Sequence, residues 1–345
     1  MNIKSTPKLP KFIPQSTSKP TAKPSVEFVT IYSNDADQRI DNYLVKKLKG
    51  VPKSHIYRII RKGEVRVNKG RISVSYKLKE GDIVRVPPIR QAEKTIVSPE
   101  DLSRLSQFVC LKKRVIYEDS NLLVINKPAG LAVHGGSGVQ LGLIEALRAQ
   151  RSPHDYLELV HRLDRETSGC LLIAKKRSML KSLHQMLRDG QIEKTYLTFL
   201  EGHWEGPKRV DAPLQKNHLQ SGERMVSVDP NGKPAQTDFS LIARSDLGTL
   251  MEAKPITGRT HQIRVHAKFM GHSVAADEKY STKEFNSLVK EKGLSRLFLH
   301  ARQLKFKMPA TQELVTLTAE LDEDLKYFLK NININITGDD LCKIQ

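Results

Sequence analysis

The chain has 345 residues, of which 39% are hydrophobic and 28% charged, a length that allows two or three domains with substantial cores. Lys and Arg number 57 against 38 Asp and Glu, for a formal net charge of +19, and this excess indicates a polyanionic partner, with nucleic acid ahead of an acidic membrane surface. No apolar run approaches the roughly 20 residues that cross a bilayer, and no secretory signal is evident, so we expect a cytoplasmic protein with no membrane partner.

The N-terminal part of the chain divides into a tail and a small module. Residues 1–27 are rich in Lys, Pro, Ser and Thr without an apolar period, which predicts a disordered basic tail. Residues 28–90 have the patterns of a compact domain. Helical and alternating apolar spacing predicts helices over 40–48 and 54–63, and strands over 65–68 and 83–86.

Positive charge is concentrated in this module. Residues 36–90 carry 15 Lys or Arg and 5 Asp or Glu, a net charge of +10. A charge run is most often a solvated surface, but its concentration on one small module favours contact with a nucleic-acid backbone. Gln38–Asp41, Tyr57–Gly63, Val65–Asn68 and Gly81-Asp82 make it resemble the alpha-L RNA-binding domain named after ribosomal small-subunit protein four. The candidate RNA-binding residues are Arg39, Lys53, Arg58, Arg61, Lys62, Arg66 and Asn68.

The rest of the chain is organised around one larger domain. Residues 91–108 are polar and predict a linker. Over residues 109–332 strands and helices mix without regular alternation, which indicates an α+β domain. The last residues, 333–345, are expected to form a loose tail.

The most informative string is His161-Arg162-Leu163-Asp164-Arg165-Glu166-Thr167-Ser168-Gly169. Its acidic residue, Asp164, stands between arginines. The apolar segments on either side, 157–160 and 170–174, are predicted to be strands. A charged loop between two core strands is a candidate site.

Two further segments combine local order with polar residues. Residues 193–200 are predicted to form a strand that contains Tyr196, after a helix that ends at Gly190. Residues 257–266 begin with a turn at Gly258 and continue into a helix that contains Arg264, with Thr260 as a candidate N-cap.

These three segments together resemble the pseudouridine synthases that modify large-subunit ribosomal RNA. They match the family's aspartate, tyrosine and arginine motifs, in that order, and the segments 126–130, 133–136 and 296–301 match further family segments. The resemblance runs from about residue 28 to 325 and is strongest to the C-type branch. It implies an α+β catalytic domain built on a mixed, mainly antiparallel sheet with flanking helices.

The resemblance also implies roles for four side chains. Asp164 is the expected catalyst at the glycosidic bond, and Arg264 is the cation that keeps this carboxylate charged. Tyr196 is expected to lie against the target base, where its hydroxyl would help to remove a proton. Arg162 is expected to fill the gap left by the flipped base. Arg165 is expected to contact phosphate at the rim.

The residues by themselves allow simpler interpretations. An Asp–Arg pair is as often structural as catalytic, a strand tyrosine is usually core packing, and Arg162 competes as a phosphate contact. His261 and His266 are five positions apart and share a helix face poorly, so we expect no metal. The isomerisation of uridine is neither redox chemistry nor hydrolysis, so we expect no cofactor.

The expected function is therefore isomerisation of specific uridines in large-subunit ribosomal RNA, at several sites near the peptidyl-transferase region. The expected partner is this RNA or its assembly intermediates, and the protein is expected to be a monomer. One alternative is a related synthase with another ribosomal or transfer RNA target. Two others are a non-catalytic ribosome-assembly factor and a glycosidase that uses Asp164 and Glu166.

Overall fold

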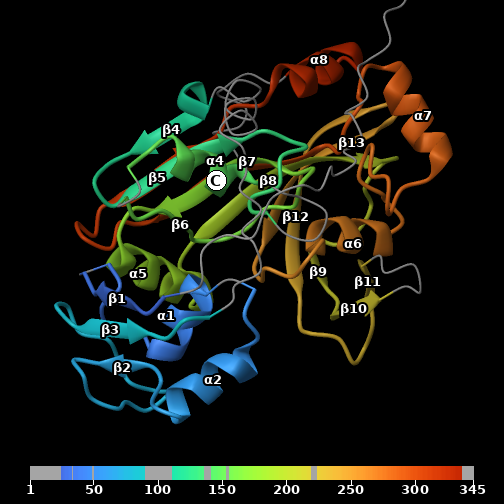
Figure 1. Cartoon of the computed structure of the whole chain (residues 1–345). Helices are drawn as coiled ribbons and strands as arrows, with labels where there is room; N and C mark the ends of the chain where they lie inside the picture. The colour runs from blue at the N-terminus through green and yellow to red at the C-terminus, as the bar shows by residue number, and fades with distance from the viewer. Residues whose placement is uncertain are drawn as a thin grey trace, which may run out of the picture. The chain divides into compact units, whose positions relative to one another are not determined.

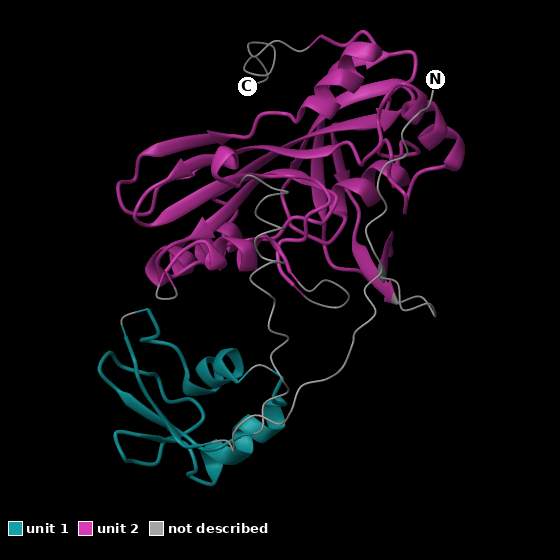
Figure 2. Cartoon of the chain, turned by 45° about the horizontal axis from the view of Figure 1, so that its top comes forward, with its two compact units in different colours: residues 1–95 teal, residues 96–345 magenta. Residues whose placement is uncertain are grey.

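The computed structural model describes residues 25–32, 34–48, 50–89, 111–135, 141–152, 155–218 and 224–335. Two compact units are present, residues 1–95 and 96–345 (Figure 2). The predicted linker at 91–108 and most of both predicted tails lie outside the described residues.

The first unit is a three-stranded antiparallel sheet with two helices. Its strands are β1 (Glu27–Thr30), β2 (Arg66–Val67) and β3 (Ile83–Val86), in the order β1-β3-β2, and its helices are α1 (Ile40–Lys47) and α2 (Lys53–Arg61). Helix α2 buries Ile56, Ile59 and Ile60 and is followed by Gly63 at φ +71°, a conformation that favours glycine. Both predicted helices and both predicted strands of this module are confirmed.

The second unit is built on one ten-stranded sheet (Figure 1). Eight strands lie in the order β4-β5-β7-β14-β8-β13-β12-β9, while β15 pairs with β14 and β6 pairs with β7. All pairs are antiparallel except β7 with β14. The strands are β4 (Val115–Glu118), β5 (Leu122–Lys127), β6 (Glu158–Leu159), β7 (Ser168–Ala174), β8 (Glu193–Glu201), β9 (Arg209–Asp211), β12 (Gln236–Ser245), β13 (Gly248–Pro255), β14 (Leu299–Lys307) and β15 (Leu314–Thr318).

Helices lie on both sides of this sheet, with α7 and α8 at the top and α5 below in Figure 1. The helical segments are η1 (Leu111–Arg114, a 3-10 turn), α4 (Leu143–Ala149), α5 (Arg177–Arg188), α6 (Gln262–Phe269), α7 (Lys283–Glu291) and α8 (Glu323–Asn331), and β10 (Leu214–His218) with β11 (Arg224–Val228) forms a separate hairpin. The predicted class, α+β with a mixed, mainly antiparallel sheet and flanking helices, is confirmed.

The core forms because successive residues of a strand face opposite sides of the sheet. On β7, Leu171 and Ile173 pack into one cluster with residues of α4, whereas Leu172 and Ala174 pack into another with residues of α5. Every residue of β7 is buried. The loop that precedes β7 is therefore attached to a fully buried strand.

Gly169, the second residue of β7, allows the parallel pairing with β14. Its φ is +109°, and a Cβ atom there would lie 2.2 Å from the carbonyl oxygen of Ala301. Because only glycine permits this approach, the first residues of β7 are fixed against β14.

Candidate active site

A cavity of about 610 Å³ opens in the second unit, and all three segments singled out in the sequence line it. The loop before β7 contributes Asp164, β8 contributes Tyr196, and the turn between β13 and α6 contributes His261. Three segments that are separate in the chain, at positions 164, 196 and 261, thus meet at one site.

Hydrogen bonds of two side chains, Lys127 and His161, hold the Asp164 loop in place. The Nζ of Lys127, at the end of β5, donates to the carbonyl oxygens of Arg165 at 2.9 Å, Pro128 at 2.8 Å and Leu131 at 2.8 Å. The Nε2 of His161 accepts the N–H of Leu172 at 3.1 Å. Burial lowers the pKa of His161 to about 4, so this ring is neutral and can serve as an acceptor.

Lys127 is unusual because its side chain is fully buried and, among the described residues, forms hydrogen bonds with carbonyl oxygens and with no carboxylate. Burial lowers its pKa to about 7, although the charges of Glu166 and Asp164 act in the opposite direction. Three carbonyl oxygens satisfy all three of its donors. In the sequence Lys127 stood out only as part of a matching family segment and was assigned no role. Its position at the end of a strand that begins with an apolar run, 122–125, and before a proline was the available signal.

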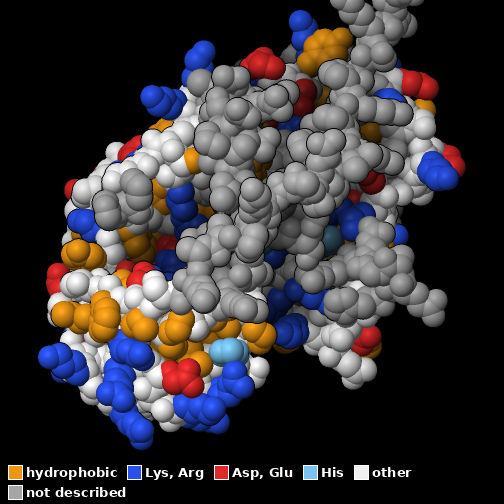
Figure 3. Space-filling view, viewed as in Figure 1, with side chains coloured by type: hydrophobic (Ala, Val, Ile, Leu, Met, Phe, Trp, Pro, Cys, Tyr) orange, Lys and Arg blue, Asp and Glu red, His pale blue; other side chains and the backbone are white. Residues whose placement is uncertain are grey.

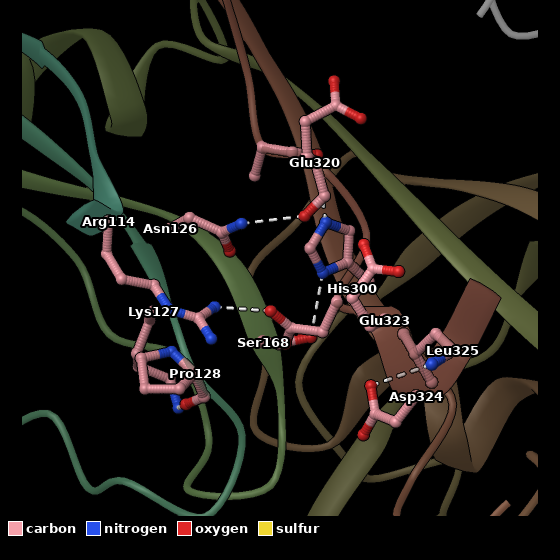
Figure 4. Close-up of polar contacts among 12 residues, drawn as sticks. Arg114, Asn126, Lys127, Pro128, Ser168, His300, Glu320, Glu323, Asp324 and Leu325 are labelled. Atoms are coloured by element: carbon pink, nitrogen blue, oxygen red, sulfur yellow. Dashed lines mark hydrogen bonds and ion pairs between the residues drawn. The ribbon is translucent and has the colours of Figure 1, made fainter. Parts of the chain in front are cut away.

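The far end of the loop is tied to β14 (Figure 4). The Oγ of Ser168 lies 2.8 Å from Nδ1 of His300 and accepts a hydrogen bond from Arg296 at 3.1 Å. Because Nε2 of His300 donates to the carbonyl of Ala319 at 3.1 Å, Nδ1 is the acceptor for the Ser168 hydroxyl. Ser168 and His300 are both fully buried, so this contact fixes the point where β7 begins.

Asp164 itself is held less tightly. Its side chain is 24% exposed, and its Oδ2 lies 3.7 Å from Nε2 of His261 and 4.0 Å from a terminal nitrogen of Arg264. Both distances exceed that of a hydrogen bond. The carboxylate therefore faces the cavity with the His261 and Arg264 side chains close by, and neither of them forms a hydrogen bond with it.

Arg264 makes its hydrogen bonds to a residue that the sequence alone did not identify. Its Nε and a terminal nitrogen each donate to the Asp277 carboxylate at 2.6 Å, and the side chain of Asp277 is fully buried. Arg264 is itself buried. The expected Asp164–Arg264 contact is thus the longer one, and the tight ion pair is Arg264–Asp277.

Tyr196 lies on β8 and packs against two core clusters while lining the cavity. Burial raises its pKa, and the nearby charge of Asp164 raises it further. The hydroxyl therefore remains protonated at neutral pH.

The two arginines beside Asp164 lie differently. Arg162 is exposed and lines the cavity. Arg165 is 60% exposed, donates to the carbonyl of Gly130 at 3.0 Å and lies 3.3 Å from Glu166. Neither Arg165 nor Glu166 is among the residues that line the cavity.

Basic side chains gather over the first unit (Figure 3). Lys53, Arg58, Arg61, Lys62 and Arg66 are exposed there, as RNA-binding residues must be. Two other candidates are engaged within the unit. Arg39 forms an ion pair with Asp41 at 2.8 Å. The side chain of Asn68 donates to Asp82 at 2.8 Å and accepts the N–H of Ile83 at 2.9 Å.

Two kinds of feature are not found in the described part of the chain. None of its helices is long and apolar enough to cross a membrane. Among the same residues, no group of three or more His, Cys, Asp or Glu side chains is arranged to hold a metal ion.

The prediction of Thr260 as the N-cap was wrong by one position. The residue that immediately precedes α6 is His261.

Comparison with known proteins matches both units. A model of the RNA pseudouridylate synthase family matches residues 121–269, and a model of the S4 domain matches residues 38–84. Ribosomal large subunit pseudouridine synthase C of Pasteurella multocida is 54% identical over 307 residues, which cover 88% of this chain and 93% of that protein. The protein of the same name from Escherichia coli K12 is 53% identical, with coverage of 90% and 98%.

A solved structure agrees with these matches. Human RNA pseudouridylate synthase domain containing 4 is 27% identical and has a TM-score of 0.57, covering 69% of this chain and 99% of its own. The family resemblance inferred from the three motifs and from the small basic module is therefore confirmed. The chain belongs to the RNA pseudouridine synthase family.

Proposed function

We propose that the protein isomerises specific uridines to pseudouridine in large-subunit ribosomal RNA. The observation that carries the proposal is the Asp164 carboxylate, which faces the cavity together with Tyr196 in a chain 54% identical to a synthase named for this RNA. The cavity volume, about 610 Å³, falls within the roughly 300–1,000 Å³ typical of small-ligand sites and leaves room for one flipped nucleotide.

The proposed chemistry needs one carboxylate at the glycosidic bond. The bond from ribose C1′ to N1 breaks and a bond from C1′ to C5 forms, while one proton leaves C5 and N1 gains one. Asp164 serves by adding to the ribose or to the base, or by acting as a base that forms an elimination intermediate. All three routes use the carboxylate oxygen atoms, and Oδ2 lies near Nε2 of His261 and a terminal nitrogen of Arg264.

Tyr196 and Arg162 complete the proposed site. A flipped base loses its stacking partners at a cost of about a few kcal/mol, and the Tyr196 ring offers a replacement surface. Since its pKa is raised, we assign Tyr196 to stacking in preference to proton removal. Arg162 is exposed at the cavity, and its planar guanidinium can stack and donate several hydrogen bonds in the gap that the base leaves.

The first unit would supply RNA affinity. We propose that Lys53, Arg58, Arg61, Lys62 and Arg66 contact phosphates, with Arg165 in the same role on the catalytic unit. Arg39 and Asn68 would act mainly by holding the fold of the module. We assign residues 28–90 to RNA binding and 109–332 to catalysis, joined by a linker at 91–108. The substrate would be ribosomal RNA or an assembly intermediate in the cytoplasm, and the enzyme a monomer.

The test uses large-subunit RNA from cells that lack this gene. Wild-type protein should convert discrete uridines, which reverse-transcription mapping of pseudouridine would locate. Asp164→Asn should bind the same RNA and keep its thermal stability while producing no pseudouridine. Full activity of this variant would refute the role of Asp164. Release of free uracil by the wild type would indicate a glycosidase, and binding without isomerisation would indicate an assembly factor.

A further inference from the structure

We propose that His261, held in position by Tyr280, is a positioning residue for the Asp164 carboxylate, and that its protonation arrests this carboxylate at acidic pH. The inference rests on the proposed role of Asp164 as the reacting group. No sequence motif had assigned such a role to either His261 or Tyr280.

The geometry connects these three side chains in a row. Nε2 of His261 points to Oδ2 of Asp164 at 3.7 Å, and Nδ1 lies 2.8 Å from the hydroxyl of Tyr280. The two rings meet edge to face with centroids 5.6 Å apart. His261 also lines the cavity. The imidazole is therefore fixed on one side by Tyr280 and presents its other nitrogen to the reacting carboxylate.

The hydrogen-bond pattern favours one tautomer of His261. The backbone N–H of Val226 donates to the Tyr280 hydroxyl oxygen at 3.1 Å, which leaves the hydroxyl proton for Nδ1 of His261. Nε2 then carries the ring proton and directs it towards Asp164. The opposite tautomer would direct a lone pair at a carboxylate, which is repulsive. A neutral His261 thus acts as a hydrogen-bond donor that comes within reach when the carboxylate shifts slightly.

The backbone supports a specific role for this residue. His261 precedes α6 with φ 54° and ψ 18°, a left-handed conformation that is unfavourable for a residue with a Cβ atom. Its side chain does not cap the helix. Residues held in such conformations concentrate at functional sites. Here the conformation keeps the ring between Tyr280 and Asp164.

One turn supports both nitrogen neighbours of Asp164. Asp277 accepts the two hydrogen bonds of Arg264 and also the N–H of Tyr280 at 3.1 Å. The Tyr280 ring lies 5.0 Å from the Arg264 guanidinium carbon and bonds His261 through its hydroxyl. The segment 277–280 therefore couples the position of His261 to that of Arg264.

The charges around His261 determine its response to pH. Burial is the largest effect and lowers its pKa. The cations Arg264 and Lys279 lower it further, while the carboxylates of Asp164 and Asp277 raise it. The net pKa is below the ordinary histidine value, so the ring is neutral at pH 7. On acidification the ring gains a proton and pairs with Asp164, and the carboxylate is no longer free to react.

The experiment is a single-turnover assay with saturating enzyme on unmodified large-subunit RNA, over a pH series. Asn tolerates the left-handed conformation but is too short to reach Asp164. His261→Asn should therefore lower the rate about 10- to 100-fold, the range expected for one hydrogen bond to a charged group. The enzyme concentration at half-saturation should not change, because RNA binding is unaffected. The acidic fall in rate that is due to His261 should disappear.

Two variants and two controls make the outcome specific. His261→Gln places an amide donor near the Nε2 position without a titrating group, so it should recover rate but not the acidic fall. Tyr280→Phe should reduce the rate by a smaller factor and serves if His261→Asn does not fold. His266→Asn, which removes a buried ring in α6 five positions after His261, should lower thermal stability and leave the pH profile intact.

Several results would overturn the inference. A wild-type rate and pH profile in His261→Asn, or in Tyr280→Phe where the first variant does not fold, would show that His261 has no such role. An acidic fall that persists in His261→Gln would assign the titration to another group. Activity in Asp164→Asn would instead refute the proposed function itself, so the two failures are distinguishable.

Discussion

The buried Arg264–Asp277 pair offers a quantitative test of how the site is supported. Both side chains are almost inaccessible, at 7% and 0% exposure, and they share two hydrogen bonds of 2.6 Å. Removing one partner of a buried pair costs about 3–5 kcal/mol, because the other charge is left without compensation. Each kcal/mol shifts the melting temperature of a unit of this size by about 2–4 °C. Asp277→Asn and Arg264→Met should therefore each melt about 6–20 °C below the wild type.

The double variant Arg264→Met with Asp277→Leu separates stability from function. Replacing both charges by apolar groups is often neutral or stabilising, so most of the decrease in melting temperature should be reversed. Activity should not return, because Asp164 then lacks one of its two nitrogen neighbours. Calorimetry and the single-turnover assay measure the two effects independently.

An exposed pair on the same unit provides the control. Arg209 and Asp238 share two hydrogen bonds, of 2.6 and 2.8 Å, but Arg209 is 56% exposed. Asp238→Asn should change the unfolding free energy by less than about 1 kcal/mol. If Arg264→Met melted no lower than Asp238→Asn, burial would not be the source of the effect. If the double variant were fully active, Arg264 would have no part in supporting Asp164.

Two further predictions concern the buried lysine and the basic module. The pKa of Lys127 is about 10.4 in the unfolded chain but about 7 in the folded protein. Between these two values the unfolded chain binds more protons than the folded protein. The unfolding free energy of the wild type should therefore rise relative to that of Lys127→Met as the pH increases from 7 towards 10. Urea unfolding over this pH range measures both proteins. If their unfolding free energies changed in parallel with pH, the pKa of Lys127 would not be lowered by folding. Replacing Arg58, Arg61 and Lys62 by Ala should flatten the dependence of log K on log salt by about 0.7–0.9 for each phosphate that the variant no longer neutralises. An unchanged slope in filter binding would show that these side chains do not bind phosphate.

The elements that local patterns specify were predictable from the sequence. The apolar stripe of α5 and its stop at Gly190, and the strand content of β8, depend on residues within one segment. The Asp164 loop was recognisable because charge inserted between two apolar strands is rare. These features depend only on the local spacing of apolar residues and on the tendency of those residues to be buried.

The partners of the site residues were not predictable in the same way. Asp277 and Tyr280 lie in an irregular turn that has no apolar period, and their roles arise from interactions with α6 and with the loop before it. A carboxylate for Arg264 was expected, but Asp164 and Asp277 are equivalent candidates by residue type alone. Asn68 was similarly ambiguous, since an amide that binds RNA and one that closes a turn have the same local sequence.

The distances around Asp164 suggest why these supporting interactions are so extensive. The His261 and Arg264 nitrogen atoms beside its carboxylate are at 3.7 and 4.0 Å, whereas the hydrogen bonds that fix those same two side chains are 2.6 to 2.8 Å. A carboxylate that accepted short hydrogen bonds would be stabilised in its charged resting state, and part of that stabilisation would disappear whenever it bonded to a substrate atom. Rigid neighbours held just beyond hydrogen-bond distance leave the oxygen atoms of this carboxylate available. In this structure the short hydrogen bonds join His261 to Tyr280 and Arg264 to Asp277, and the Asp164 carboxylate remains available to react.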